Sequence, residues 1–178
     1  GTLNALSLGP VAAWDPQRIA GRTDMAFAGR IFARTLTAYA PTTDPDAQAK
    51  LVGDLATDTG TPSKDLKVWS FTLREGVKWQ DGSDFTADDV VLSIKRLQGE
   101  TSNFRVYGNA VGTPRRIDDH TVELTTPVPN PVMLEMLSNS LFIMSRKWCE
   151  KHNVVKAQDF KNKEETFAVR NAMGTGPY

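Results

Sequence analysis

The sequence is poor in the residues that build cysteine and histidine sites, with a single cysteine, Cys149, and two histidines among 178 residues. One cysteine cannot form a disulfide within the chain, and it excludes a cysteine-rich metal site. We expect Cys149, beside a tryptophan, to be a small apolar core residue rather than a reactive thiol. No segment approaches the roughly 18 consecutive apolar residues needed to span a bilayer.

An excess of charge of either sign is also lacking, because Lys+Arg and Asp+Glu both number 21. This balance disfavours a general nucleic-acid-binding protein, which normally carries a basic excess or stripe. Hydrophobic residues make up 40% and charged residues 24% of the chain, which is typical of a folded globular protein. The length suits one ordinary domain or two small ones.

Motifs for catalysis are absent too, with no GxSxG and no HExxH sequence. His120 follows two aspartates in an expected turn, and His152 lies at the expected end of a helix. Asp88 and Asp89 fall in the first turn of an expected helix, where carboxylates are favoured electrostatically. Gly174-Thr175-Gly176 lacks the Gly-Lys-Ser/Thr ending of a phosphate-binding loop. These residues give no support to catalysis, and we expect a protein that is not an enzyme.

The clearest structural signal present is the period-two alternation of Val68–Arg74, which predicts a strand. A glycine turn follows, and Val77–Trp79 is predicted as a second strand. Thr86 stands three residues before Asp89 in a near-capping box, so a helix is expected to run from there to about Gln98. Its apolar residues recur at helical spacing.

The rest of the chain gives weaker patterns. We predict helices over Thr23–Thr37, Val132–Leu137, Ser145–His152 and Glu164–Ala172, a hairpin around the turn 118–120, and a buried strand at Leu141–Met144.

Aromatic residues fall into two groups. Trp69, Phe71 and Trp79 have strand spacing, which indicates core positions rather than a ligand platform. Phe104 and Tyr107 stand in residues 99–114, which we predict to be an exposed loop. These two are candidate ligand contacts, and a simple role in anchoring the loop is the open alternative.

The run VWSFTLREGVKWQDGSDFTADDVVLSIKR, from Val68 to Arg96, closely resembles the signature of the family 5 extracellular solute-binding proteins. These are the dipeptide- and oligopeptide-binding receptors of bacterial ABC importers. Three further segments fit the same family: an N-terminal strand followed by Asp-Pro in Gly1–Pro16, a strand pair in Arg116–Thr125, and the closing Gly-Thr-Gly-Pro-Tyr. The resemblance covers nearly the whole chain.

The resemblance implies an α/β fold of the periplasmic-binding-protein-like type II class, with a partial first lobe and an inserted mixed α+β subdomain. Residues 1–36 would begin lobe I with a strand and helix at the cleft. Residues 37–167 would form the inserted subdomain, and residues 168–178 would return to lobe I. The second lobe is expected to lie outside this sequence.

The implied function is the extracytoplasmic substrate-binding component of an ABC importer. It would capture a peptide or similar small solute and deliver it to ABC permease subunits in the membrane, without a cofactor or metal. It would also bind the remainder of its own receptor, the second lobe, and it would not bind nucleic acid. The chain opens on GTLNALSLGP, so an exported protein, periplasmic or lipid-anchored, would have lost its leader.

Within the sequence, the segment after Asp15-Pro16 resembles the part of the family that approaches the cleft. The ligand-binding candidates implied there are Ala20, Gly21, Arg22 and Thr23, with Phe104 and Tyr107 as a second set. Arg22 would pair with an acidic group on the ligand, or would be a solvated residue near a helix start. Two other functions stay open: a hydrolase or enzyme subunit built on a binding-protein-like fold, and a stand-alone interaction module.

Overall fold

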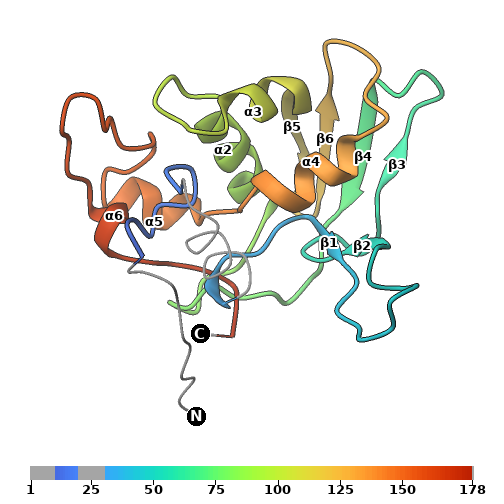
Figure 1. The fold of residues 1–178 in the computed structure, drawn as a ribbon, viewed down its shortest axis with the longest axis horizontal. Coiled ribbons are helices and arrows are strands. Elements are labelled where there is room, and N and C mark those ends of the chain that lie inside the picture. Colours follow the sequence, from blue (N-terminus) through green and yellow to red (C-terminus); the bar gives the residue numbers. More distant parts are fainter. Residues whose placement is uncertain (1–10, 20–30, 178) are drawn as a thin grey trace.

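The computed structural model describes residues 11–19 and 31–177. Figure 1 shows a sheet on one side of the molecule, helices α5 and α6 on the opposite side, and helices α2 and α3 between them. Residues 1–10, where the N-terminal strand is expected, and residues 23–30 of the predicted helix lie outside the described residues. After them, residues 33–36 are not helical and strand β1 (Thr37–Tyr39) begins at Thr37, so the predicted helix does not extend to Thr37.

The main sheet has four antiparallel strands in the order β3-β4-β6-β5. They are β3 (Thr61–Pro62), β4 (Val68–Thr72), β5 (Thr113–Asp118) and β6 (Thr121–Thr125). A separate two-stranded sheet pairs β1 with β2 (Leu51–Gly53). The predicted strand at Val68 and the hairpin around residues 118–120 are confirmed.

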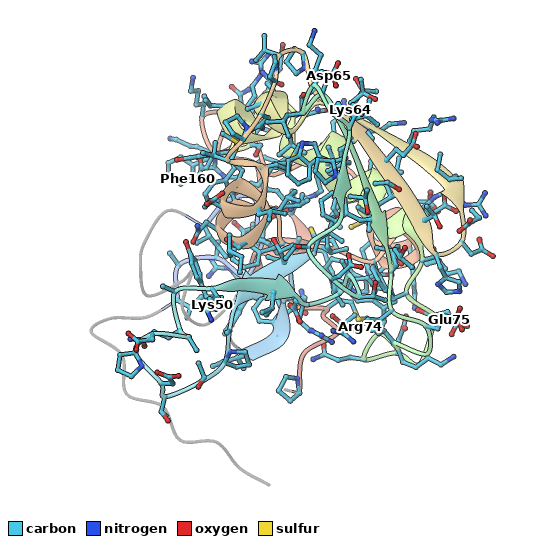
Figure 2. The ribbon with its side chains drawn as sticks, turned by 90° about the vertical axis from the view of Figure 1, so that its right-hand side faces the viewer. Lys50, Lys64, Asp65, Arg74, Glu75 and Phe160 are labelled. Atoms are coloured by element: carbon cyan, nitrogen blue, oxygen red, sulfur yellow. The ribbon has the colours of Figure 1, made fainter. Side chains whose placement is uncertain are left out.

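Alternation explains how β4 and β6 build the core. Trp69 pairs with Leu124 and Phe71 with Val122, and all four side chains are buried on one face of the sheet. The predicted core positions of these aromatics are therefore confirmed. Charged residues stand at both ends of β4, where Lys64 and Asp65 precede the strand and Arg74 and Glu75 follow it, and all four are exposed (Figure 2).

Helix α2 (Ala87–Leu97) covers the buried face of the sheet and packs against β5 and β6. Its start follows the predicted capping box, since the Thr86 N–H donates to Asp89 Oδ2 at 2.9 Å. Val90, Ile94 and Leu97 are fully buried at helical spacing. The helix predicted from sequence is confirmed, with Gln98 as its C-cap.

Residues 77–79 do not form the predicted second strand. The only ladder contact there is an isolated bridge between Lys78 and Asp84, and the Trp79 N–H donates to Ser83 O at 2.9 Å. The glycine turn at Gly82 folds this short segment back onto itself, which leaves no length for pairing with the sheet. Trp79 is nonetheless buried, as predicted.

Residues 99–114 are not simply an exposed loop, because they contain helix α3 (Arg105–Val111). Gly108 lets α3 approach the end of α2, since a Cβ at this glycine would lie 3.0 Å from the Gln98 nitrogen. The Gln98 side-chain amide donates to Gly108 O at 3.0 Å and to Gly112 O at 2.7 Å. Tertiary contacts of this kind, rather than a periodic pattern, stabilise α3.

The C-terminal half follows the predicted helices only in part. Helices α4 (Met133–Ser140) and α5 (Arg146–Lys151) are confirmed, with Ser145 capping α5, whereas α6 (Phe167–Arg170) is shorter than predicted. Residues 141–144 are buried but form no strand. The Ile143 N–H donates to Arg34 O at 2.9 Å and the Met144 N–H to Ser93 Oγ at 2.8 Å, so neither pairs with a strand.

Among the helices in the described parts of the chain, none is both long and apolar enough to cross a membrane.

Candidate ligand-binding groove

Phe104 and Tyr107 line one groove on the surface of the protein. The two rings lie with centroids 6.4 Å apart and planes tilted by 50°. The groove has a volume of about 510 Å³, within the usual range for small-molecule sites. It runs between α3 and α4, and its lining residues are Phe104, Tyr107, Val132, Glu135, Met136, Asn139 and Ser140.

Asn130 holds the two walls of this groove together. Its side-chain amide donates to Ala110 O near the end of α3 at 3.2 Å, while its Oδ1 accepts the N–H of Val132 at 3.2 Å, where α4 begins. Asn130 is buried, so these bonds are shielded from water. Sequence reasoning missed this residue, whose only signal is its place in the proline-rich segment 127–131.

The surface of the groove is largely apolar, with a few polar groups at its edge. Val132 and Met136 lie one helical turn apart on α4 and provide apolar wall, while Glu135 and Asn139 are exposed. The α4 residues were not predicted as site residues. Their helical spacing is visible in the sequence, but nothing there places α4 opposite Phe104.

The other predicted contact residues, Ala20, Gly21, Arg22 and Thr23, lie outside the described residues. The segment that leads to them is described and is held by Asn103, the neighbour of Phe104. The Asn103 amide donates to Arg18 O at 2.8 Å, and its Oδ1 accepts from Arg18 Nη1 at 2.6 Å. Residues 17–19 therefore lie against the beginning of the groove wall.

A buried ion pair fixes the same N-terminal segment from the other side. Arg96 donates from Nη1 and Nη2 to the two carboxylate oxygens of Asp15, each at 2.6 Å, and both side chains are 0% exposed. Arg96 also donates to Gln17 Oε1 and to the backbone oxygens of Val154 at 3.0 Å and Lys156 at 3.1 Å. We call this set of contacts the Arg96 junction. Sequence reasoning missed it.

The acidic residues near the start of α2 are structural. Asp89 is buried and accepts hydrogen bonds from the indole N–H of Trp79 at 3.1 Å, the N–H of Thr86 at 2.9 Å and the N–H of Arg146 at 2.7 Å. Burial raises the pKa of the Asp89 carboxyl, and these three bonds oppose the rise. The interpretation of Asp89 as a helix-start residue is confirmed, and its bonds to Trp79 and Arg146 extend that role.

Cys149 is buried, as predicted for a small apolar residue. Loss of hydration raises the pKa of its thiol to about 12, so the thiolate is strongly disfavoured at neutral pH. His120 occupies the predicted turn, where its backbone N–H donates to Asp118 Oδ1 at 2.8 Å.

Comparison with known proteins gives a consistent set of relatives. The family model described as bacterial extracellular solute-binding proteins, family 5 Middle, matches residues 50–178. The periplasmic oligopeptide-binding protein OppA of Salmonella typhimurium is 29% identical over 143 residues, covering 65% of this chain and 26% of that protein. The probable D,D-dipeptide-binding periplasmic protein DdpA of Escherichia coli is 30% identical over 131 residues, covering 71% of this chain and 23% of that protein.

Solved structures agree with this. NikZ from Campylobacter jejuni, in complex with Ni(L-His), matches with a TM-score of 0.75 and 26% identity, over 96% of this chain and 31% of that one. MoaA from A. tumefaciens R10, in complex with mannopinic acid, matches with a TM-score of 0.74 and 30% identity, over 94% of this chain and 31% of that one. The predicted α/β fold of the periplasmic-binding-protein-like type II class, present here in part, is confirmed. The chain spans about a quarter of the length of the curated relatives.

Proposed function

Because the chain belongs to the family 5 bacterial extracellular solute-binding proteins, we propose that it is part of the substrate-binding component of an ABC importer. It captures a peptide or a similar small solute and delivers it to permease subunits in the membrane. It acts by binding and release, without chemical change of the solute. Two relatives named as binding oligopeptides and dipeptides support a peptide as the solute.

The single observation that carries this proposal in the structure is the groove between α3 and α4. It combines two aromatic rings, apolar α4 side chains and a small number of polar groups, which is the usual make-up of a small-molecule site. Phe104 and Tyr107 contact the ligand in this proposal. A second lobe would cover the open side of the groove and close on the solute by a hinge motion.

The remaining contacts come from Ala20, Gly21, Arg22 and Thr23 in the proposal. Support comes from Asn103 and the Arg96 junction, which fix residues 15–19 immediately before them. Arg22 provides a guanidinium that suits an acidic group of the ligand.

We further propose the division into residues 1–36 and 168–178 as lobe I and residues 37–167 as an inserted subdomain. The two outer segments bond to each other, since Trp14 N–H donates to Val169 O at 3.0 Å and Gly176 N–H donates to Phe32 O at 2.8 Å. Gly174 makes this approach possible, because a Cβ there would lie 1.9 Å from Phe32 O. Phe32 also belongs to a small apolar cluster separate from the main core.

The proposed location is extracytoplasmic, in a periplasm or at the cell surface as a lipoprotein after removal of a leader. The relatives named as periplasmic support it.

Native mass spectrometry of the complete receptor, purified from its source, tests the proposal. We expect a bound small solute that is released unchanged on denaturation. Incubation of the receptor with candidate peptides tests for the opposite outcome. Cleavage of a peptide with turnover would overturn a role in binding alone and would favour a hydrolase.

A further inference from the structure

Among the described residues that line the groove, Glu135 has the only charged side chain. It lies in the first turn of α4 and is exposed. Its backbone oxygen accepts hydrogen bonds from Ser138 and Asn139, but within residues 11–19 and 31–177 no basic side chain forms an ion pair with its carboxylate. Within the described part of the chain, the groove therefore presents a carboxylate without a basic partner.

Four other acidic side chains have partners within the protein. Asp15, Asp54 and Asp88 each pair with an arginine, and Asp89 accepts three hydrogen bonds. Those contacts explain their positions without a ligand. No such contact accounts for Glu135, which stands beside two aromatic rings.

The surroundings of Glu135 favour a cation on an apolar stem. The rings of Phe104 and Tyr107 attract a positive charge through their π faces. Val132 and Met136 provide apolar surface for methylene groups, which long basic side chains bury while their charged ends stay at a polar edge. Beside the Glu135 carboxylate, an acidic ligand group would find no compensating cation among the described lining residues, which disfavours it at this position.

We propose that the groove binds a lysine-type side chain of a peptide and that Glu135 determines this specificity. The ammonium group pairs with the Glu135 carboxylate, and the methylene stem lies along Val132 and Met136 beside the two rings. This rests on the proposed function, because it supposes that the groove is a solute site. The alternative occupants of the same groove are a purely apolar side chain and the free amino terminus of a peptide.

Binding of two matched peptides to the complete receptor, measured by isothermal titration calorimetry, tests the inference. The peptides are Ala-Lys-Ala and Ala-norleucine-Ala, which differ in the side-chain ammonium group. We expect the receptor to prefer the lysine peptide by about tenfold, which corresponds to about 1.4 kcal/mol. Glu135→Gln should abolish this preference by weakening the binding of the lysine peptide.

Glu75→Gln is the matched control, because Glu75 is an exposed glutamate in the loop after β4 (Figure 2) and does not line the groove. It should keep the full preference for lysine. Far-ultraviolet circular dichroism of both variants checks that the fold is intact.

The outcomes separate the inference from the proposed function. Equal binding of both peptides by the unchanged receptor, or a preference that survives Glu135→Gln, would overturn the inference and leave peptide binding standing. A preference abolished by acetylation of the amino terminus, and insensitive to the side chain, would replace lysine with the amino terminus. Failure to bind any peptide, together with a co-purified solute of another class, would overturn the inference and the peptide assignment together.

Discussion

Two regions of the protein are buried: the core between the sheet and α2, and the Arg96 junction. They differ in the kind of interaction that holds them together. The first consists of apolar side chains from β4, β6 and α2, such as Phe71 and Ile94. The second consists of a bidentate ion pair and backbone hydrogen bonds. The apolar core gains free energy from every side chain added, whereas the ion pair must first offset the cost of removing two charges from water.

The two regions also differ in how visible they are in the sequence. Neighbouring residues of β4 and α2 carry their own periodic patterns, which act locally. Arg96 instead bonds to Asp15 across 81 residues and to Val154 across 58. The difference indicates that apolar packing sets the arrangement of the sheet and α2, while the ion pair fixes how the N-terminal segment joins them.

The largest effect should come from the apolar core. Phe71→Ala removes a fully buried ring and should lower the free energy of unfolding by about 4 kcal/mol. Thr72→Ala, at an exposed position of the same strand, should change it by less than about 0.5 kcal/mol. Chemical denaturation followed by tryptophan fluorescence measures both. Similar losses for the two variants would contradict the core described here.

Arg96→Met should cost about 3 kcal/mol, because it leaves the buried Asp15 carboxylate without its partner. Lys95→Met is the matched control: this neighbouring basic residue of α2 is exposed, so its loss should be nearly neutral. In an Asp15→Asn background, Arg96→Met should cost clearly less, since the uncompensated charge is gone. Additive effects in the double variant would argue against coupling of the two residues.

Asp89→Asn should cost about 2 kcal/mol at neutral pH, because the amide has one acceptor oxygen in place of two for the three donors. Burial holds the pKa of Asp89 above its ordinary value of 3.8, so the folded state retains this proton to higher pH than the unfolded state. The stability contributed by the protonated form is present below pH 3.8 and is lost as pH rises through the raised pKa.

The difference in unfolding free energy between the native protein and Asp89→Asn, measured across that pH range, reports this titration. The native protein should lose stability relative to the variant as pH rises. A change of the opposite sign would mean that the hydrogen bonds to Asp89 outweigh its burial.

The smallest effect should come from a surface ion pair. Arg115 and Glu123 pair across β5 and β6, with the arginine side chain 68% exposed. Arg115→Ala should change the free energy of unfolding by no more than about 0.5 kcal/mol, and added salt should reduce the difference. Equilibrium denaturation at low and high salt checks this. A loss as large as that of Arg96→Met would show that burial does not separate the two pairs.

Much of the fold could be predicted from the sequence wherever local patterns, such as alternation and helix capping, agree with the final structure. Alternation at Val68 and the capping pair Thr86 and Asp89 predicted β4 and the start of α2. Helix α3 was missed because its stability depends on packing against Gln98, and residues 141–144 were predicted as a strand because burial alone does not distinguish extended segments with and without a pairing partner.

The candidate site could be predicted from the sequence only in part. Phe104 and Tyr107 were visible as aromatics in a polar segment, and the structure brings them to one groove. Their opposite wall, including Glu135, comes from a helix about 30 residues later, and only the fold brings it beside them. The Arg96 junction was hidden for the same reason, since a basic residue in the last turn of a helix is ordinarily solvated.

The central proposal is that the apolar core between the sheet and α2 holds the fold, while the groove between α3 and α4 contacts the solute. The affinity of Tyr107→Ala for the co-purified solute, in the complete receptor, tests it most directly. Tyr107 is 46% exposed and lines the groove, whereas the adjacent Val106 is 79% exposed and does not. We predict that Tyr107→Ala weakens binding about tenfold or more, with Val106→Ala unchanged. Equal affinities for both variants and the native protein would contradict the claim.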